Sequence, residues 1–379
     1  MTFIPFNQSY VSGKEDQYVC EAIKSRALAG DGPFTKKVQE KITSHVGVGR
    51  SLFTHSGTAA LEMAALLSNL VPGDEVIMPS FTFVSTANAF VLRGAVPVFI
   101  DIRPDTLNLD ESLLEQAITA RTKVIVPVHY AGVSCEMDVI MNCAKAHNLL
   151  VVEDAAQALY SRFKGIPLGG IGDMGAFSFH ATKNIGCGEG GAFVANSPEL
   201  AERAEIIREK GTNRSKFFRG QVDKYSWVDI GSSYLPSELN AAYLLAQLEV
   251  GQLITNQRLE IWGRYHDAFM SLERDGLARR PIIPQGCEHN GHIYYLLMPS
   301  LDSRDQFIAY MKGCGIGLSF HYVPLHSTDY AATCSRVGSN MSNTDSLSSR
   351  LVRFPVWPGI ESKIDYVIEK AYEFFGLPT

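Results

Sequence analysis

Short β-rich runs alternate with helical stretches through the first two-thirds of the chain, and this alternation constrains the fold more than any other feature. Four runs predict buried strands, and two longer runs between them predict helices. The strands are expected at residues 75–79, 96–100, 123–128 and 149–152, and the helices at residues 59–70 and 136–147. Because such alternation is typical of parallel sheets, we predict an α/β fold with a mostly parallel sheet and helices on both faces.

The pattern changes after about Leu248. A long helical stretch over residues 252–272 leads into a proline-containing segment around Pro281 and Pro284, and a smaller α+β unit follows. A chain of 379 residues is longer than one ordinary domain, so two domains are expected. We predict a large domain with an N-terminal arm over residues 1–251 and a small C-terminal α+β domain over residues 252–379.

Charge and cysteine content argue against several classes of protein. The net charge of −6 argues against a general nucleic-acid binder. The seven cysteines are an odd number without a C-x-x-C pair, so neither a disulfide framework nor a metal site is expected. The N-terminus has no basic stretch followed by an apolar one, and no apolar run is long enough to span a membrane. A cytoplasmic protein with no membrane partner is therefore expected.

The residues that follow the predicted strands are the first indication of a site. In open α/β sheets, ligands bind beyond the carboxyl ends of the strands. Here the segments that follow β-rich runs are polar or aromatic, and the fold would bring them to one edge. They are residues 79–83, 129–132, 153–157 and 180–183. No G-x-G-x-x-G segment follows an early strand, which argues against a dinucleotide-binding Rossmann domain.

Lys183 ends a β-like stretch of apolar and aromatic residues, and glycines follow it at positions 186, 188, 190 and 191. Glycines let the backbone approach a bound group closely. A lysine among apolar neighbours is desolvated, so its pKa falls and its neutral amine can form a Schiff base. For a lone lysine, a surface position beside a flexible turn would be the better interpretation. The segments described next favour the interpretation that Lys183 is catalytic.

Asp154 directly follows an apolar strand and is the second part of the predicted site. A lysine that forms a Schiff base and a carboxylate that keeps a ring nitrogen protonated are the groups that pyridoxal phosphate needs. We therefore assign Asp154 to the ring nitrogen and Gln157 to the neighbourhood of the ring hydroxyl. The alternative is that Asp154 caps the next helix. Asp154 by itself favours neither interpretation over the other.

A helix that begins near Thr58 with small and hydroxyl-bearing residues would offer its N-terminus to a phosphate. Thr58 and Ala59 are the candidates there, and Ser178 could add a hydroxyl from another segment. Phe83 follows a strand and could stack on a planar ring. A plain helix cap and a core aromatic are the alternatives. Each part is weak alone, but their order and their placement at strand ends make the set specific.

Together these segments resemble the DegT/StrS family of sugar aminotransferases. That family is a branch of the type I pyridoxal-phosphate-dependent transferase fold, which is aspartate aminotransferase-like. The resemblance covers essentially the whole chain, and the stretch that ends in Lys183 is highly specific. It rests on residues 30–33, 79–83, 127–132, 153–157, 177–184, 189–191 and 321–326.

The resemblance implies pyridoxal 5′-phosphate as the cofactor of the large domain and a homodimer with a shared active site. It implies that Lys183 forms the Schiff base and moves the proton, and that Asp154 pairs with the pyridine nitrogen. The other implied cofactor contacts are Thr58, Ala59, Phe83, Gln157 and Ser178.

Residues 208–225 and 231–234 are most similar to a subgroup of the family that acts on dTDP-linked sugars. This implies amino transfer from glutamate to the C4 keto group of dTDP-4-dehydro-6-deoxy-D-glucose, for surface polysaccharide synthesis. Residues 208–224 contain six basic residues against two acids, which suits a pyrophosphate. The substrate-binding candidates are Arg214, Phe217, Arg219 and His321.

Alternatives to this function stay open. The basic run could be a solvated helix end and loop, which is the usual fate of a charge run. The enzyme could aminate the sugar at C3, or the protein could be a non-catalytic regulator that keeps the cofactor. A few family members carry histidine in place of the lysine and catalyse dehydration, and Lys183 argues against that activity.

Ser233 is a departure from the family pattern. Many members carry an asparagine within a G-x-N-Y segment, and that asparagine reaches the phosphate bound by the partner subunit. Here Ser233 occupies the aligned position. A serine can still donate a hydrogen bond, so we expect Ser233 to contribute to cofactor binding.

Overall fold

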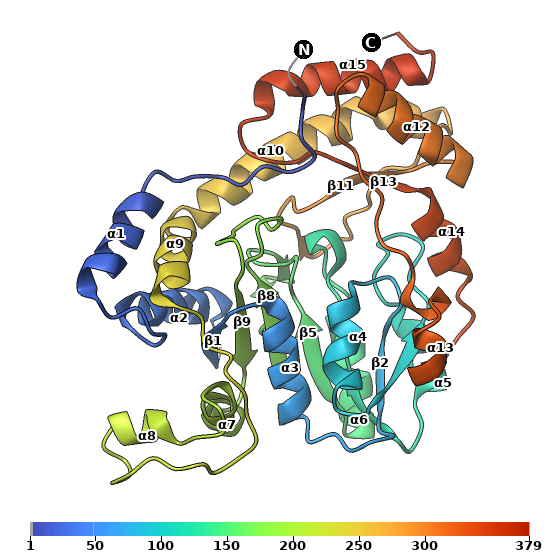
Figure 1. The fold of residues 1–379 in the computed structure, drawn as a ribbon. Coiled ribbons are helices and arrows are strands. Elements are labelled where there is room, and N and C mark those ends of the chain that lie inside the picture. Colours follow the sequence, from blue (N-terminus) through green and yellow to red (C-terminus); the bar gives the residue numbers. More distant parts are fainter. Residues whose placement is uncertain (1–2, 48, 379) are drawn as a thin grey trace.

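The computed structural model describes residues 3–47 and 49–378 and is built around one large sheet (Figure 1). The sheet has eight strands in the order β1-β9-β8-β5-β4-β2-β3-β12. In chain order these are β1 (Arg50–Thr54), β2 (Glu75–Pro79), β3 (Val96–Ile100), β4 (Thr122–Ile125), β5 (Leu150–Asp154), β8 (Met174–Ser178), β9 (Gly191–Ala195) and β12 (Arg336–Val337). In the sheet, the six neighbouring strands β8, β5, β4, β2, β3 and β12 pair in parallel. The strand β9 is antiparallel to both of its neighbours, β1 and β8.

The predicted mostly parallel sheet is therefore confirmed. The strands predicted at 75–79 and 96–100 have the predicted bounds, and those at 123–128 and 149–152 are shifted to β4 and β5. The two predicted helices are α3 (Gly57–Leu67) and α6 (Met137–His147). Such differences of a few residues are ordinary, because helix and strand ends fray.

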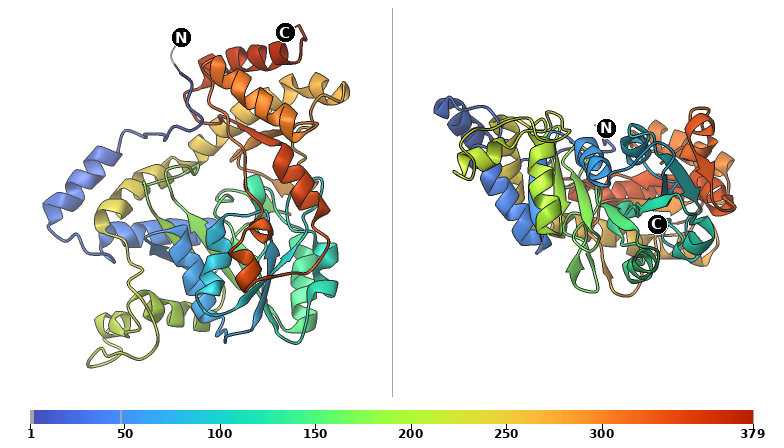
Figure 2. Two further views of the ribbon diagram at one scale, coloured as in Figure 1. Left: turned by 45° about the vertical axis from the view of Figure 1, so that its right-hand side comes forward. Right: turned by 90° about the horizontal axis from the view of Figure 1, so that it is seen from below.

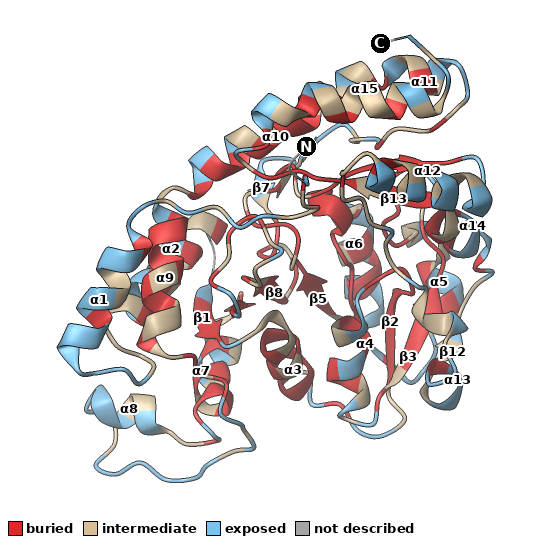
Figure 3. Cartoon of the chain, turned by 45° about the horizontal axis from the view of Figure 1, so that its top comes forward, coloured by how far each residue is buried: buried red, intermediate tan, exposed pale blue. Residues whose placement is uncertain are grey.

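Side chains of each strand alternate between two hydrophobic cores, one on each face of the sheet. In β2, Ile77 belongs to the first core, and its neighbours Val76 and Met78 belong to the second. This is the two-residue period of a strand that is buried on both faces. The first core is covered by α2 (Pro33–Val46), α6 and α9 (Glu238–Glu249). The second is covered by α3, α4 (Val84–Val91) and α7 (Pro198–Arg208). Figure 3 shows the strands and α3 as buried, whereas α1 (Glu15–Ser25) and α8 (Arg214–Phe218) are largely exposed.

The C-terminal part of the chain has its own core and lies at one end of the large sheet (Figure 2). Its two-stranded sheet pairs β11 (Tyr294–Leu297) with β13 (Leu351–Phe354) in antiparallel fashion. The helices α10 (Gly251–Ala268), α12 (Leu301–Gly313) and α15 (Ile364–Phe374) supply the rest of this core. The predicted helix at 252–272 is α10 followed by the short α11 (Met270–Arg274).

The division into residues 1–251 and 252–379 stays a prediction, and segments of each part pack on the other. Ile4 exchanges backbone hydrogen bonds of 2.8 Å with Gly315 and Gly317, so the N-terminal arm packs on the C-terminal unit. In the other direction, β12 joins the large sheet beside β3, and β10 (Cys287–Glu288) pairs with β6 (Arg162–Phe163).

The remaining elements are short or peripheral. They are α1 (Glu15–Ser25), α5 (Leu114–Ala117), α8 (Arg214–Phe218), α13 (Ala331–Cys334), α14 (Ser342–Arg350) and β7 (Ile166–Pro167), with 3-10 turns η1 (Glu111–Leu113), η2 (Tyr130–Gly132), η3 (Leu325–Ser327) and η4 (Glu361–Lys363). Among the described residues, no helix combines the length and the apolar character needed to cross a membrane.

Candidate active site

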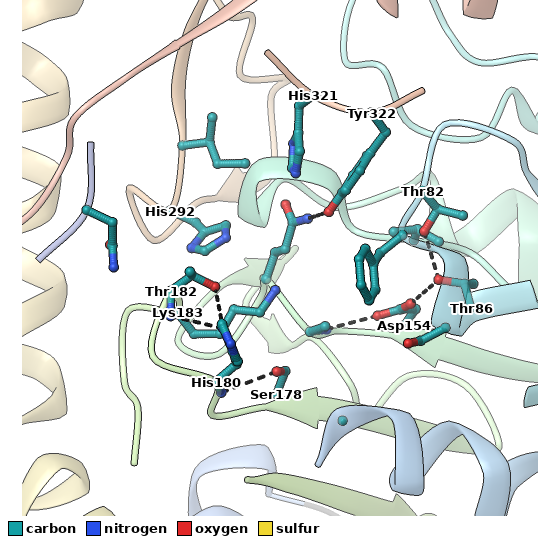
Figure 4. A pocket seen from close by; sticks show the side chains of 18 of the residues that line it. Thr82, Thr86, Asp154, Ser178, His180, Thr182, Lys183, His292, His321 and Tyr322 are labelled. Carbon is teal, nitrogen blue, oxygen red and sulfur yellow. Dashed lines mark hydrogen bonds between the residues drawn. The ribbon is translucent and has the colours of Figure 1, made fainter. Parts of the chain in front are cut away.

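A cavity of about 600 Å³ lies at the carboxyl ends of the parallel strands, between the large sheet and the C-terminal unit. The start of α3, the ends of β5 and β8 and the loop after β8 form one side. The C-terminal unit contributes His292, His321, Tyr322 and Arg353, and the N-terminal arm contributes Asn7. Figure 4 shows Lys183, Asp154, Ser178 and His321 around this space, as expected where parallel strands end together.

Lys183 lies in the loop after β8, half-buried against the cavity. Its backbone N–H donates to the carbonyl oxygen of His180 at 2.9 Å. Burial lowers the pKa of the Lys183 amine from 10.5 to about 8; the carboxylate of Asp154 opposes this shift, and Arg353 adds to it. At pH 7, about a tenth of such lysines are neutral, so the amine is available as a nucleophile.

Asp154 is the last residue of β5 and is 5% exposed. Its Oδ2 accepts a hydrogen bond from Thr86 Oγ1 at 2.7 Å, and its Oδ1 accepts one from the N–H of Ala156 at 3.2 Å. Thr86 is held in turn by Thr82, whose hydroxyl lies 2.8 Å away. The alternative assignment of Asp154 as a helix cap is wrong, because the next element after β5 is the strand β6.

The surroundings of Asp154 fit a positively charged ring nitrogen. The carboxylate is buried and faces the cavity, yet among the described residues it has neutral hydrogen-bond donors and no cation. An unpaired buried charge is costly, so such a carboxylate favours a ligand that brings a protonated nitrogen. The residues present therefore fit pyridoxal phosphate.

The N-terminus of α3 also borders the cavity. Ser56 caps the helix and accepts a hydrogen bond from the N–H of Ala59 at 3.0 Å. Thr58 pairs with Ser85 through their hydroxyls at 2.8 Å. Thr58 and Ser178 both line the cavity, which suits a phosphate at the positive end of the helix. Ala59 is buried and does not line the cavity, and its N–H is already used by the cap.

Two glycines allow this end of the cavity to form. A Cβ on Gly57 would lie 2.9 Å from Cβ of Ser178, and a Cβ on Gly191 would lie 2.3 Å from the backbone of Ser56. Real Cβ atoms do not approach backbone that closely, so side chains here would push α3 away from β8 and β9.

Gln157 and Phe83 line the cavity as predicted. The side-chain carbonyl of Gln157 accepts from the N–H of Ala131 at 2.7 Å, and its amide nitrogen donates to the hydroxyl of Tyr322 at 3.0 Å. Phe83 is 58% exposed at the N-terminus of α4, so the alternative that it is a core residue is wrong. A large exposed ring at the cavity is available for stacking on a ligand.

His321 lines the cavity beside Tyr130 and Tyr322. Its Nδ1 lies 3.1 Å from the Tyr130 hydroxyl, and its ring centroid lies 3.4 Å from that of Tyr322. Burial, with Arg353 nearby, lowers the pKa of His321 well below the ordinary value, so the imidazole is neutral at pH 7.

Besides Ala59, the structure leaves four of the predicted site residues outside this cavity: Ser233, Arg214, Phe217 and Arg219. They belong to α8 and the segment after it, which project from the large sheet at the end away from the C-terminal unit (Figure 1). Arg219 donates to both carboxylate oxygens of Glu205, at 2.9 and 3.1 Å. Arg214 donates to Glu209 at 3.1 Å and stacks on Phe218. Ser233 is exposed.

The sequence analysis missed several cavity residues. Thr86 could have been found from its position one helical turn after Thr82, and Tyr322 from its place beside His321. His292, whose Nδ1 lies 2.8 Å from Asn184 Oδ1, and Arg353 have no local signal. They reach the cavity only through the packing of the C-terminal unit against the sheet.

Comparison with known proteins agrees with this geometry. The model of the DegT/DnrJ/EryC1/StrS aminotransferase family matches residues 10–371. The chain is 35% identical to the spore coat polysaccharide biosynthesis protein SpsC of Bacillus subtilis (strain 168), over 97% of this chain and 96% of that protein. It is 32% identical to the UDP-4-amino-4-deoxy-L-arabinose–oxoglutarate aminotransferase of Shewanella sediminis (strain HAW-EB3), over 99% and 98% of the two chains.

Solved structures show the same fold. The Streptococcus pneumoniae protein Spr1654 in its PLP form aligns with a TM-score of 0.89 and 27% identity, over 98% of each chain. A PMP form of the same protein has also been solved and aligns with a TM-score of 0.89. The predicted aminotransferase-like α/β fold is thus confirmed.

Proposed function

The chain belongs to the DegT/DnrJ/EryC1/StrS aminotransferase family and uses pyridoxal phosphate as its cofactor, and from this premise we propose that it transfers an amino group from glutamate to the C4 keto group of a nucleotide-linked sugar. One observation carries the proposal. A lysine with a lowered pKa and a buried carboxylate that forms no ion pair among the described residues face the same cavity, which is also lined by the N-terminus of α3.

The cofactor, when bound, supplies an aldehyde for the amino group and a ring that withdraws electrons. Lys183 Nζ would hold the cofactor at its aldehyde carbon. When free, the same amine would move a proton to or from the carbon that carries the transferred nitrogen. Asp154 keeps the ring nitrogen protonated, and Thr86 orients its carboxylate. Gln157 would hold the ring hydroxyl and Phe83 would stack on the ring. Thr58 and Ser178 would hold the phosphate, and Ala59 would contribute only as part of the first turn of α3.

The relatives support a sugar as the acceptor. One is named for polysaccharide biosynthesis, and another for a 4-amino sugar and oxoglutarate, the keto acid that glutamate leaves behind. We propose dTDP-4-dehydro-6-deoxy-D-glucose as the acceptor and a dTDP-4-amino-4,6-dideoxyhexose as the product. The similarity of residues 208–225 and 231–234 to dTDP-4-amino-4,6-dideoxygalactose transaminase supports this choice. The product would serve a surface polysaccharide such as enterobacterial common antigen.

We propose further that the enzyme is a homodimer whose partner subunit completes the site. The segment from α8 to Ser233 has exposed aromatic side chains, with Trp227 82% and Phe218 69% exposed. Exposed apolar groups that lie together mark protein–protein contacts. Ser233, Arg214, Phe217 and Arg219 do not line the cavity of their own chain, but in a dimer they would meet the phosphate and the sugar nucleotide of the other subunit.

Product analysis tests this function. The purified protein is incubated with glutamate and dTDP-4-dehydro-6-deoxy-D-glucose, and the product is examined by NMR. An amino group at C4 supports the proposal. A parallel incubation with the 3-keto isomer tests the alternative, because turnover of that isomer alone, to a C3-amino sugar, would assign the enzyme to C3. If the protein retains the cofactor but turns over neither dTDP-linked nor UDP-linked keto sugars, the result supports the alternative that it is a non-catalytic regulator.

A further inference from the structure

Three side chains that can ligate a metal ion converge where α5 packs on α6, outside the candidate active site. Glu115 lies in α5, and Cys143 and His147 lie in α6. Their ligand atoms, a carboxylate oxygen, a sulfur and a ring nitrogen, all lie within 4.8 Å of one another. None of the three residues lines the active-site cavity. Cys143 and His147 are four residues apart and therefore share one face of their helix, which α5 supplements with Glu115.

The distances between these atoms are close to those of a tetrahedral zinc site. The Nε2 atom of His147 lies 2.9 Å from Oε2 of Glu115. Zinc bonds of about 2.0–2.3 Å in a tetrahedron separate the ligand atoms by about 3.3–3.6 Å. To admit the ion, Glu115 and His147 must therefore move apart by about 0.4 Å, and the Cys143 sulfur must approach by no more than about 1.3 Å. The exposed side chains of Glu115 and His147 can make this adjustment, whereas Cys143 is fixed in the core.

The chemistry of the three ligands selects among cations. Thiolate, imidazole and carboxylate are the ligands of zinc sites, whereas Mg²⁺ and Ca²⁺ take oxygen ligands. The cluster also lies at the carboxyl end of α6, because His147 is the last residue of that helix. The helix dipole places partial negative charge at this end, which favours a cation. Both features point to an ion of the zinc type.

The cluster leaves one coordination position open. In the part of the chain that the structure describes, no fourth histidine, cysteine or acidic side chain belongs to it. His147 also lines a hollow of about 390 Å³ between the start of β4 and the end of α6, so water can reach the imidazole. Lys123 lines the same hollow, but its side chain is exposed and can turn toward solvent. Zinc sites with three protein ligands commonly hold water in the fourth position.

We propose that Glu115, Cys143 and His147 bind one zinc ion, with water as the fourth ligand, and that the ion ties α5 to α6. The alternative is that Glu115 and His147 form an ordinary surface ion pair and that Cys143 only fills the core, as buried cysteines often do. The spacing of the cysteines predicts no metal site, but spacing cannot show ligands that two separate helices bring together. The inference does not depend on the proposed function, because the cluster lies outside the active-site cavity.

Titration of the cofactor-loaded protein with zinc chloride, followed by calorimetry, measures binding directly. The protein carries no histidine tag, and residual metal is removed with a chelator beforehand. We expect wild type to bind one equivalent of zinc at its tightest site. The thermal midpoint should rise with the zinc concentration, because an ion that binds only the folded state stabilises it. With Co²⁺ in place of zinc, the difference spectrum should show charge-transfer absorption from a thiolate to the metal.

Three variants each remove one ligand: Glu115→Gln, Cys143→Ala and His147→Gln. Loss of a residue that only orients a metal ligand weakens metal binding by about tenfold to about a hundredfold, so each variant should weaken zinc binding by at least about tenfold. Cys143→Ala should also abolish the charge-transfer absorption of the Co²⁺ form. The matched controls are Cys20→Ala, which removes an exposed thiol, and His326→Gln, which removes another histidine that pairs with an acidic residue. Both controls should bind zinc as tightly as wild type.

Two results would overturn the inference. Either wild type takes up no zinc, or all three ligand variants bind zinc as tightly as wild type, which would place the ion elsewhere. Glu115→Gln and His147→Gln change exposed side chains, so they keep the test decisive if Cys143→Ala does not fold. Removal of zinc should leave the half-reaction with glutamate unchanged. If zinc binds at this cluster but the protein transfers no amino group, the proposed function fails and the inference stands.

Discussion

At the scale of single residues, burial sets the proton chemistry of Lys183. In cofactor-free protein, only the neutral amine can attack the aldehyde of the cofactor. Because the pKa is lowered from 10.5 to about 8, the neutral fraction rises with pH and is nearly complete above about pH 9. We expect the rate of covalent cofactor attachment to rise about tenfold per pH unit below pH 8 and then to level off. Stopped-flow absorbance measures this rate.

The control for this pH profile is Lys183→Ala, which should show no covalent attachment and no turnover. The cofactor would then bind only through its phosphate and ring contacts. A wild-type rate that keeps rising up to pH 10 would mean that Lys183 has an ordinary pKa and is not desolvated.

Asp154 provides the second prediction at this scale. Asp154→Asn keeps the shape and removes the charge that holds the ring nitrogen protonated. We expect both half-reactions to slow by about a hundredfold or more. The thermal midpoint of the cofactor-free protein should not fall, because the variant removes a buried carboxylate that has no cation among the described residues. Comparable activity in wild type and variant would contradict this role.

At the scale of elements, the contact between α3 and β9 depends on Gly191. Gly191→Ala would place a methyl group 2.3 Å from the backbone of Ser56 and displace the N-terminus of α3. We expect a loss of about 1–3 kcal/mol in the free energy of unfolding and weaker cofactor binding. Denaturant titration and cofactor titration measure the two effects.

Gly263→Ala is the matched control, because Gly263 lies inside α10 and an added Cβ would have no neighbour within 4 Å. Alanine favours a helix over glycine, so this variant should be as stable as wild type or more stable, by up to about 1 kcal/mol. If the two variants behave alike, the close packing at Gly191 does not position α3.

The short helix α8 provides a test of the predicted pyrophosphate site. Arg219 neutralises Glu205, whose side chain is 4% exposed, so its charge reversal would destabilise the fold as well. Arg214 is 48% exposed on its side chain and offers the cleaner change. We expect Arg214→Gln to raise KM for the sugar nucleotide severalfold and to leave the glutamate half-reaction unchanged. The effect should shrink as salt rises, because the Debye length falls from about 8 Å at physiological salt.

Arg274→Gln is the control for Arg214. Like Arg214, Arg274 lies on a short helix, α11, and pairs with an acidic residue, but α11 belongs to the C-terminal unit. Its kinetics should match those of wild type. If KM for the sugar nucleotide is unchanged in Arg214→Gln, the basic residues of this segment are simply exposed to solvent, and other residues bind the pyrophosphate.

At the scale of the whole molecule, the projecting segment after α8 makes the proposed dimer testable. Trp227→Glu places a charge on an exposed aromatic surface and should lower the mass measured by light scattering to that of a monomer. Cofactor retention during dialysis should fall with it. Ser233→Ala should keep the dimer mass and still weaken retention, because Ser233 would contact the partner's phosphate.

The control for the dimer is Val71→Glu, at a valine that is 59% exposed in the loop between α3 and β2. It should not change the mass. A wild-type protein that is monomeric, or a Ser233→Ala variant that retains the cofactor fully, would contradict the shared active site.

The sequence by itself determined the layers of the fold and indicated the two groups that we propose to react. Strand positions followed from local hydrophobic runs, and Asp154 followed from its place at a strand end, since the carboxyl ends of parallel strands meet at one edge. The prediction that Lys183 ends a strand was wrong, because β8 ends at Ser178, but the loop that follows β8 still brings Lys183 to the same edge. Such features depend on neighbours in the sequence. They are therefore visible without the tertiary structure.

Only the tertiary structure decided what surrounds these groups. The bond from Thr86 to Asp154, the hydroxyl of Tyr322 on Gln157 and the guanidinium of Arg353 come from distant segments. Their distances and burial, and hence the pKa of Lys183, arise when the C-terminal unit packs over the sheet edge. No local pattern encodes that packing, because it is set by the summed contacts of both units. For the same reason, the sequence could place Ser233 and Arg214 in a site but could not say that they lie outside their own chain's cavity.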